Sequence, residues 1–176
     1  MVEFKYESTC RVSTFNIIAP DAIIGKHVTI GAFNVIEDNC NIEKYAVLEN
    51  HITLKSLTII GESSRLENGV QTSGFCRVGK NCIVKQGVII GRQVVILDDT
   101  FISPNVVFLY ADHNQQWKGK QTTISKNVFI GSGCQILPGV FVANGVTIGA
   151  GSVVTKDLTE ENSIYVGSPA KFIRKK

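Results

Sequence analysis

Apolar residues recur at every sixth position along most of this chain. Sixteen positions from residue 18 to residue 108 share this spacing, and Thr72 is the one polar residue among them. The series is Ile18, Ile24, Ile30, Ile36, Ile42, Leu48, Leu54, Ile60, Leu66, Thr72, Val78, Val84, Ile90, Ile96, Ile102 and Phe108. The spacing resumes with Ile124, Ile130, Ile136, Val142, Ile148 and Val154. A fixed period of six residues predicts a parallel β-helix, in which each six-residue unit forms one side of a coil.

A second set of positions supports the same geometry. The residues two places before each aliphatic position are mostly small or β-branched, for example Val28, Ala46 and Val88. Residues two apart on a strand point to the same side, so both sets are predicted to face inward. Glycine often follows the aliphatic residue, and glycine or asparagine often lies two residues further on, where these residues turn a corner with positive φ at low cost. The pattern predicts a triangular prism with three six-residue sides per turn.

This [Ile/Leu/Val]-Gly-x-x-x-x pattern resembles the repeat of the hexapeptide-repeat acyltransferases. The resemblance implies an all-β fold, a left-handed parallel β-helix. It alone provides the handedness, because parallel crossovers are otherwise right-handed. We expect a single domain over residues 1–176, with repeat coils at about 12–108 and 124–159, an excursion loop at about 109–123 and a short C-terminal tail over 160–176.

Composition and charge argue against two classes of partner. The chain has 176 residues, the size of one domain, and its net charge of +3 is too small to suggest nucleic-acid binding. The N-terminal residues lack the apolar core of a signal peptide, and no apolar span reaches the length of a membrane helix. We therefore expect no nucleic-acid or membrane partner and a cytoplasmic location.

The interruption of the repeat points to chemistry. Phe108 and Ile124 are sixteen residues apart where six would keep the phase, and a β-helix tolerates such an insertion only at a corner. In the acetyltransferases that this sequence resembles, a loop at this location carries a histidine that acts as general base. The matching residue here is His113, whose ordinary pKa of about 6.5 leaves the imidazole neutral at cellular pH. The alternative is a solvated loop histidine.

Three neighbours of His113 are candidates for the acceptor site. Tyr110 and Trp117 are expected to line the acceptor pocket, although both could instead fix the loop to the prism. Asp112 could orient His113, a role that a backbone carbonyl could fill equally well.

The C-terminal third carries the strongest family resemblance. Segments such as 148–157 (IGAGSVVTKD) and 167–174 (GSPAKFIR) resemble the acetyl-CoA-binding end of sugar O-acetyltransferases of the galactoside and maltose type. The resemblance implies cofactor contacts at Ser132, Ala150, Thr155, Lys156 and Arg174. Ser132 and Ala150 are one full coil of three sides apart and should stack on adjacent coils, where small residues leave room for the pantetheine arm. Backbone N–H groups of residues 131–133 are candidate donors to the oxyanion of the tetrahedral intermediate.

Histidines and cysteines give no sign of a metal site. Hexapeptide-repeat carbonic anhydrases bind zinc through three histidines, but His27 and His51 are separated by one full coil plus one further side and should lie on different edges. The five cysteines follow the phase of the small inward positions, where cysteine behaves as a small hydrophobic residue. We expect no metal.

The sequence therefore predicts an acetyl-CoA-dependent acetyltransferase, with transfer to a hydroxyl or amine of a sugar or sugar nucleotide and with His113 as general base. Two alternatives stay open: acetylation of a non-sugar small molecule, such as an antibiotic or amino acid, and a non-catalytic β-helix scaffold. The identity of the acceptor, O- versus N-acetylation, the length of the acyl donor and the pathway are not predicted.

Assembly is predicted from the outward-facing positions. Several of them are apolar, namely Ile17, Ile59, Ile89, Val95 and Val107, and a recurring outward apolar stripe suggests a buried face. The acyltransferases that this sequence resembles are trimers with active sites between subunits. We expect a homotrimer, with three times the chain mass of 19.2 kDa.

Overall fold

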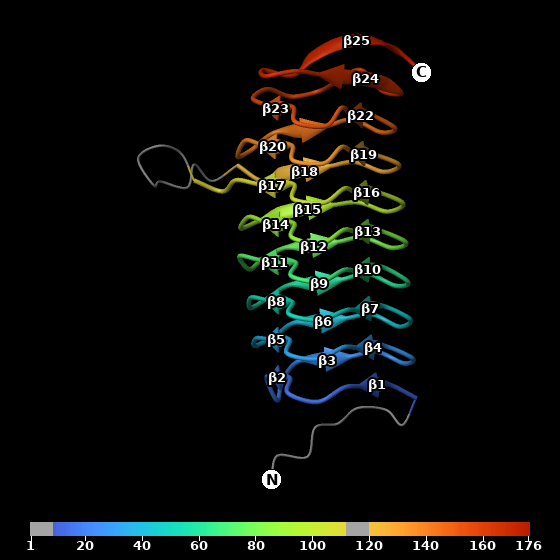
Figure 1. Cartoon of the computed structure of the whole chain (residues 1–176), viewed down its shortest axis with the longest axis vertical. Helices are drawn as coiled ribbons and strands as arrows, with labels where there is room; N and C mark the ends of the chain where they lie inside the picture. Colours follow the sequence, from blue (N-terminus) through green and yellow to red (C-terminus); the bar gives the residue numbers. More distant parts are fainter. Residues whose placement is uncertain (1–8, 112–119) are drawn as a thin grey trace.

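Short parallel strands stack into three flat faces around one core (Figure 1). The computed structural model describes residues 9–111 and 120–176, and these residues form 25 strands. None of the described residues is helical, so this part of the chain has no helix that could cross a membrane. The architecture is the predicted β-helix.

Each face is one sheet whose neighbouring strands come from successive coils. The ten-stranded face contains β1 (Arg11–Val12), β4 (Thr29–Ile30), β7 (Val47–Leu48), β10 (Arg65–Leu66), β13 (Ile83–Val84), β16 (Phe101–Ile102), β19 (Phe129–Ile130), β22 (Thr147–Ile148), β24 (Ser163–Val166) and β25 (Lys171–Lys175). The eight-stranded face contains β2 (Ile17–Ile18), β5 (Val35–Ile36), β8 (Thr53–Leu54), β11 (Gln71–Thr72), β14 (Ile89–Ile90), β17 (Val107–Phe108), β20 (Gln135–Ile136) and β23 (Val153–Val154). The seven-stranded face contains β3 (Ile23–Ile24), β6 (Asn41–Ile42), β9 (Ile59–Ile60), β12 (Arg77–Val78), β15 (Val94–Ile96), β18 (Thr122–Ile124) and β21 (Phe141–Val142).

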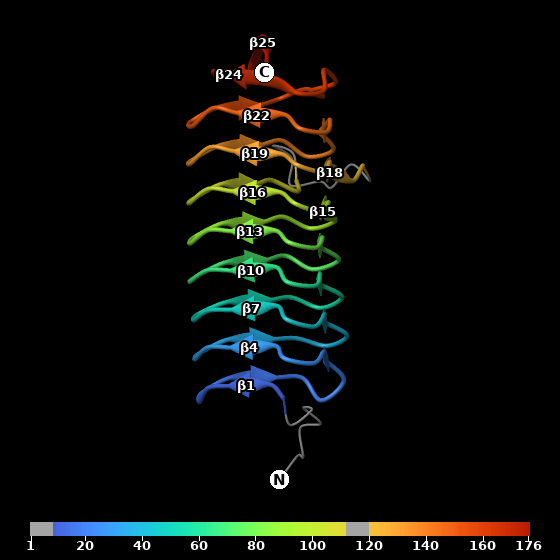
Figure 2. The ribbon, with the colours of Figure 1, turned by 90° about the vertical axis from the view of Figure 1, so that its right-hand side faces the viewer.

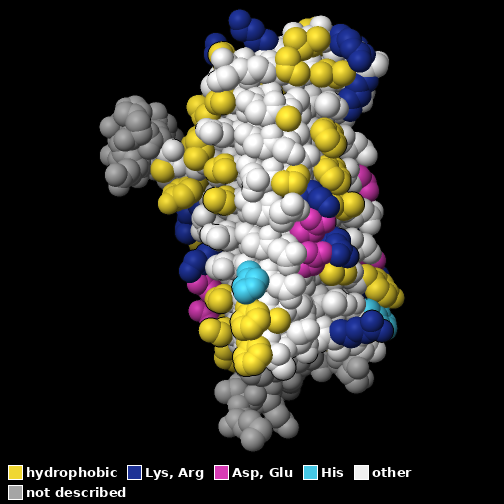
Figure 3. Space-filling model, in the orientation of Figure 1, with side chains coloured by type: hydrophobic (Ala, Val, Ile, Leu, Met, Phe, Trp, Pro, Cys, Tyr) yellow, Lys and Arg dark blue, Asp and Glu magenta, His cyan; other side chains and the backbone are white. Residues whose placement is uncertain are grey.

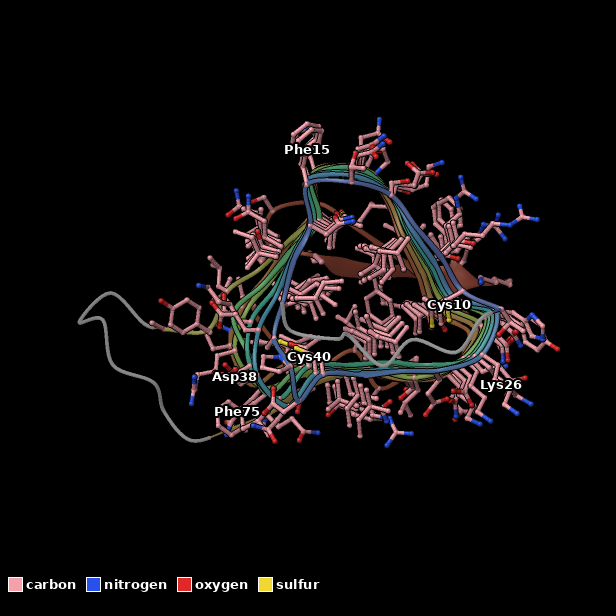
Figure 4. The ribbon with its side chains drawn as sticks, turned by 90° about the horizontal axis from the view of Figure 1, so that it is seen from below. Cys10, Phe15, Lys26, Asp38, Cys40 and Phe75 are labelled. Carbon is pink, nitrogen blue, oxygen red and sulfur yellow. The ribbon has the colours of Figure 1, made fainter. Side chains whose placement is uncertain are left out.

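The helix is left-handed, as the resemblance implied. Seen from the N-terminal end in Figure 4, the chain passes from Cys10 to Phe15, then through the corner that carries Asp38 one coil later, and on to Lys26. This path runs anticlockwise while the coils recede from the viewer. One turn takes three six-residue sides, because Arg11 pairs with Thr29 on the next coil.

Both predicted inward sets form the core. The aliphatic positions are almost completely buried, and the small positions before them fill the corners of the prism. All five cysteines are free, and Cys40, Cys76, Cys82 and Cys134 are buried as predicted. The core is therefore continuous along the axis of the prism.

The corners of nearly all described sides have a residue with positive φ, even where that residue is bulky. Phe15, Phe33 and His51 adopt φ values of 62°, 60° and 57°, in a region that large side chains rarely enter. Their rings stack in a column along one edge, with centroids 5.1 Å and 5.2 Å apart. Figure 3 shows this exposed column of hydrophobic side chains ending in a histidine. We call this edge, between the ten-stranded and eight-stranded faces, the aromatic edge.

Two expectations need correction. The expected tail contains β24, which lies above β22 and continues the ten-stranded face in parallel with it (Figure 2), and β25, which pairs antiparallel with β24. The expected outward stripe is not one stripe: Ile17, Ile89 and Val107 lie on the eight-stranded face, whereas Ile59 and Val95 lie on the seven-stranded face. The sequence period does not distinguish the three sides, so it could not assign these residues to faces.

A matched pair of variants tests the inward assignment. Ile102→Ala removes a fully buried side chain and should lower the free energy of unfolding by about 2–5 kcal/mol, because it loses apolar burial and leaves a cavity. Ile83→Ala, on an adjacent strand of the same face but 39% exposed, should cost much less. Urea unfolding monitored by circular dichroism measures both. Equal losses would contradict the assignment.

Candidate active site

The excursion leaves the prism at the edge between the eight-stranded and seven-stranded faces. It connects β17 to β18, and the corners of earlier coils, residues 37–39, 55–57, 73–75 and 91–93, lie on the same edge. We call it the loop edge. Three predicted site residues, Asp112, His113 and Trp117, lie outside the described residues. The described structure therefore fixes where the loop begins and ends.

Both ends of the excursion pack on the neighbouring coils. Gly91 lies below the first end, where a Cβ atom would clash with the Phe108 carbonyl oxygen and come within 3.1 Å of the Tyr110 Cβ. At the other end, Thr122 Oγ1 accepts a hydrogen bond of 2.8 Å from the Gly139 N–H, and the Lys120 ammonium lies 3.6 Å from the Asp157 carboxylate. Tyr110 is exposed at the base of the loop, which is compatible with its predicted contact to an acceptor.

Ser132 and Ala150 stack on adjacent coils as expected. Both are exposed at the aromatic edge, and the Gly151 N–H donates to the Ser132 carbonyl over 2.8 Å. A Cβ atom at Gly133 or Gly151 would meet nothing within 4 Å. The two coils therefore present a strip of small residues along the axis, with no neighbouring atom close to where a Gly133 or Gly151 side chain would lie.

Two of the expected oxyanion donors are already engaged. The Gly131 N–H donates to the Ile148 carbonyl, and the Gly133 N–H donates to the Pro104 carbonyl over 3.0 Å. A donor used in the ladder between coils is not free to bind an oxyanion, so the expectation for these two groups is wrong. The regular stacking of coils, which the sequence itself predicted, is the physical reason.

The remaining predicted cofactor residues lie on two other parts of the prism. Thr155 and Lys156 follow β23 on the loop edge, two corners above the excursion, and both are exposed. Arg174 is exposed on β25, opposite Ile164 of the ten-stranded face. Within one chain, Ser132 lies beside Ala150, and Thr155 lies beside Lys156. These two pairs lie on different edges, and Arg174 lies near neither pair.

The sequence analysis missed a hollow on the loop edge. It has a volume of about 360 Å³ and lies on the coils below Tyr110, between the eight-stranded face and the corners that follow it. Its lining includes Glu37, Lys55, Gly74, Phe75 and Arg92. One residue in the sequence could have indicated this hollow. Thr72 is the single polar residue in the inward aliphatic series, and it lines the hollow.

An ion pair dominates the electrostatics of this hollow. The Lys55 ammonium donates to the Glu37 carboxylate over 2.6 Å, and this hydrogen bond lowers the pKa of Glu37. Partial desolvation acts in the opposite direction, and bonds of 3.2 Å from the Ser56 N–H and hydroxyl add to the lowering. Glu37 is therefore held as a carboxylate.

The other reactive side chains are placed as predicted. His27 stacks on Tyr45 at one edge, and His51 stacks on Phe33 at the aromatic edge. Burial raises the pKa of the Cys82 thiol to about 11, so this thiol is not an activated nucleophile. Among residues 9–111 and 120–176, no group of three His, Cys, Asp or Glu side chains could hold a metal ion.

Two family descriptions match the chain. The GMPPB C-terminal domain matches residues 12–120, and the bacterial transferase hexapeptide (six repeats) matches residues 121–156. The boundary between them falls at the end of the excursion, before β18. Together they cover almost the whole prism.

Curated relatives and solved structures extend the comparison. A protein of Saccharomyces cerevisiae named "Putative acetyltransferase" is 39% identical over 108 residues, which is 56% of this chain and 55% of that protein. The bifunctional protein GlmU of Thermodesulfovibrio yellowstonii is 34% identical over 149 residues, 80% of this chain but 32% of that protein. The matches thus span about half or less of these relatives. A galactoside acetyltransferase solved in complex with coenzyme A has a TM-score of 0.58 and 32% identity, covering 67% of this chain and 64% of that one.

The Glu37–Lys55 pair gives a prediction for titration. Because the ammonium stabilises the carboxylate, the folded-state pKa of Glu37 should lie below that of a solvated glutamate, and Lys55→Met should return it toward that range. The stability that this pair contributes is present at neutral pH and is lost as the pH falls through the folded-state pKa. Carboxyl ¹³C NMR measures the titration. Lys80→Met, which removes a partner of Glu62 instead, is the control, and an unchanged Glu37 titration in Lys55→Met would contradict the assignment.

Proposed function

The chain belongs to the family of the GMPPB C-terminal domain and continues into a bacterial transferase hexapeptide segment, and we propose that it is an acetyl-CoA-dependent sugar acetyltransferase. The observation that carries this proposal is the 32% identity to a galactoside acetyltransferase solved with coenzyme A. The acceptor group in the proposal is a hydroxyl or amine of a sugar or sugar nucleotide.

Several features of the prism support this function. The strip of small residues at Ser132 and Ala150 leaves space along the axis for the pantetheine arm. Lys156 and Arg174 are exposed cations that could meet phosphates of the donor. Acetyltransferase relatives match the chain by sequence as well as by fold. The proposal therefore assigns the C-terminal coils to the donor.

In the proposed reaction His113 acts as general base. Its neutral imidazole removes the proton from the acceptor hydroxyl or amine while that oxygen or nitrogen attacks the thioester carbonyl of acetyl-CoA. A bond from the acceptor to the acetyl carbon forms, the carbon–sulfur bond breaks, and the departing thiolate takes up the proton from the imidazolium. None of the buried cysteines whose pKa is raised is suited to an acyl-enzyme, so the transfer is direct.

We further propose that the site is completed by a second subunit. The excursion starts at the loop edge, whereas Ser132 and Ala150 lie at the aromatic edge, across the width of the eight-stranded face. The outward apolar residues of the sequence prediction lie on the two faces that flank the loop edge, for example Ile89 on one and Ile59 on the other, while the ten-stranded face has exposed apolar residues such as Phe129. Packing these faces against neighbouring copies would bring the loop of one subunit to the strip of another.

The catalytic proposal is tested by His113→Ala. This variant should lower the turnover of acetyl transfer by about 10² to 10⁴, the usual contribution of a positioned general base. Stabilisation by CoA in a thermal-shift assay should remain, because the proposed donor contacts lie in other coils. Release of CoA thiol with a sugar acceptor measures turnover.

Lys156→Ala is the matched contrast. It should raise the KM for acetyl-CoA with a smaller loss of kcat, and Arg174→Ala should behave in the same way. Full activity of His113→Ala at neutral pH would contradict the general base. Failure of millimolar CoA to stabilise the wild-type protein would contradict the whole proposal.

The assembly proposal predicts a particle with three times the chain mass of 19.2 kDa. Light scattering at micromolar concentration measures this mass. Ile17→Glu, which places a charge on the eight-stranded face away from the hollow on the loop edge, should dissociate the trimer and abolish activity together, because the proposed site needs two subunits. A monomeric wild-type protein would contradict both the trimer and the shared site.

A further inference from the structure

The one exception in the inward series marks a local change in the ladder of the eight-stranded face. The β8–β11 pair keeps one register pair, Gln71 with Thr53, where neighbouring pairs keep two. At this point the Lys55 N–H donates to Thr72 Oγ1 over 3.0 Å. Thr58 Oγ1 lies 3.0 Å from Thr72 Oγ1 and donates to the Lys55 carbonyl over 2.6 Å. The two hydroxyls and the Lys55 peptide groups close a ring of hydrogen bonds, which fixes the backbone of Lys55.

Gly74 opens a hollow at the corner beside this ring. Its φ is +88°, and the next residue, Phe75, also has a positive φ of 55°. A Cβ atom at Gly74 would lie 3.1 Å from the Ser56 carbonyl oxygen, 3.6 Å from Lys55 Cβ and 3.8 Å from Arg92 Nη1. The missing side chain thus leaves space between a cation on the coil below and a cation on the coil above.

Arg92, the cation on the coil above Gly74, is held in a fixed orientation. The Arg92 guanidinium carbon lies 4.1 Å from the centroid of the Phe75 ring, a cation–π contact that orients the planar group. No carboxylate among the described residues lies within ion-pair distance of Arg92. Its N–H donors are therefore oriented before a ligand arrives, which lowers the entropy cost of binding a planar or tetrahedral oxyanion.

The lower part of the hollow adds a second cation and neutral donors. Lys55 is positioned by Glu37, and Ser56, Ser73 and Gln71 contribute hydroxyl and amide groups to the lining. The lining has two cations and one carboxylate, so it keeps an excess of one positive charge. The backbones of Lys55 and Arg92 lie two coils apart, roughly 10 Å along the axis at the spacing of β-strands, and the Arg92 side chain reaches down to the Gly74 corner between them.

We propose that this hollow binds the oxyanion, a phosphate or a carboxylate, of an anionic sugar, with Arg92 as the main contact. Resting on the proposed function, this inference makes the acceptor an anionic sugar, because Arg92 lies one coil below Tyr110 at the base of the excursion. A charged group at the hollow would place the remainder of the acceptor toward the loop. The volume of about 360 Å³ suits a single sugar with its anionic substituent.

Three sugars with a common ring test the inference by direct binding. Glucose 1-phosphate, glucuronate and glucose present a phosphate, a carboxylate and no charge, and isothermal titration calorimetry on the wild-type protein measures their affinities. We expect the charged sugars to bind and glucose not to bind at the same concentrations. Arg92→Gln should weaken the binding of the charged sugars by roughly tenfold or more, because a charged hydrogen-bond partner is lost.

The control removes the same charge elsewhere. Arg77 is exposed on β12 of the seven-stranded face, and Arg77→Gln should bind the charged sugars as the wild type does. Binding of glucose 1-phosphate alone would support the inference and identify phosphate as the oxyanion, and binding of glucuronate alone would identify a carboxylate. Absence of binding by both charged sugars, or equal weakening in Arg77→Gln, would overturn it.

The same samples separate this inference from the proposed function. Stabilisation by CoA reports on the donor strip and should be unchanged in Arg92→Gln. A protein that binds glucose 1-phosphate through Arg92 but is not stabilised by CoA would contradict the acetyltransferase and leave the anion site standing. The opposite result would overturn the anion site alone.

Discussion

Every coil of this protein must present its backbone donors and acceptors to the coil above and the coil below in a constant register. Ladder bonds such as Gly61 N–H to the Val78 carbonyl and Gly79 N–H to the Ile96 carbonyl repeat along the prism, and most sides have only two or three residues in strand geometry. An insertion or a bulky inward residue would interrupt these bonds. Variation is therefore confined to the corners and to outward positions, where function must also lie.

The three edges use this freedom differently. The aromatic edge carries stacked rings on the early coils and small residues such as Ser132 and Ala150 on the late coils. The loop edge carries the excursion and the Gly74 corner, two departures from the regular repeat. Both departures lie where the eight-stranded face meets the seven-stranded face, within two coils of each other. A departure from the repeat interrupts the backbone hydrogen bonds between coils and so destabilises the fold. The occurrence of both departures on one edge therefore favours a functional role for that edge.

The sequence predicted the features that depend on the six-residue repeat. The prism, the inward residues, the corner at which the excursion emerges, and the stacking of Ser132 on Ala150 all follow from counting in sixes. The sequence-based prediction was incomplete in two kinds of place: where the six-residue spacing breaks, and where the structure depends on hydrogen bonds that the spacing does not reveal. Ile148 pairs with Tyr165, one residue short of a full coil, so the six-residue period predicts a tail where the chain adds one more strand, β24, to the prism. The Gly74 hollow depends on Thr72 replacing a ladder carbonyl as acceptor for the Lys55 N–H, which is a matter of hydrogen-bond geometry that residue spacing does not contain.

A ligand bound at an edge of such a prism is contacted only by coils of its own chain from below and above, and its outer side stays in water. The strip at Ser132 and Ala150 and the base of the loop lie on opposite borders of one flat face, and a flat sheet cannot close over a substrate. In the proposed oligomer, a neighbouring molecule would provide solvent exclusion at the reacting atoms, which strengthens every charge interaction there. The two faces flanking the loop edge carry exposed apolar side chains such as Ile89 and Phe141 where such a neighbour would pack, and the ten-stranded face carries others, such as Phe129. In the proposed trimer, the neighbouring subunit would supply the wall that the described faces of a single prism lack.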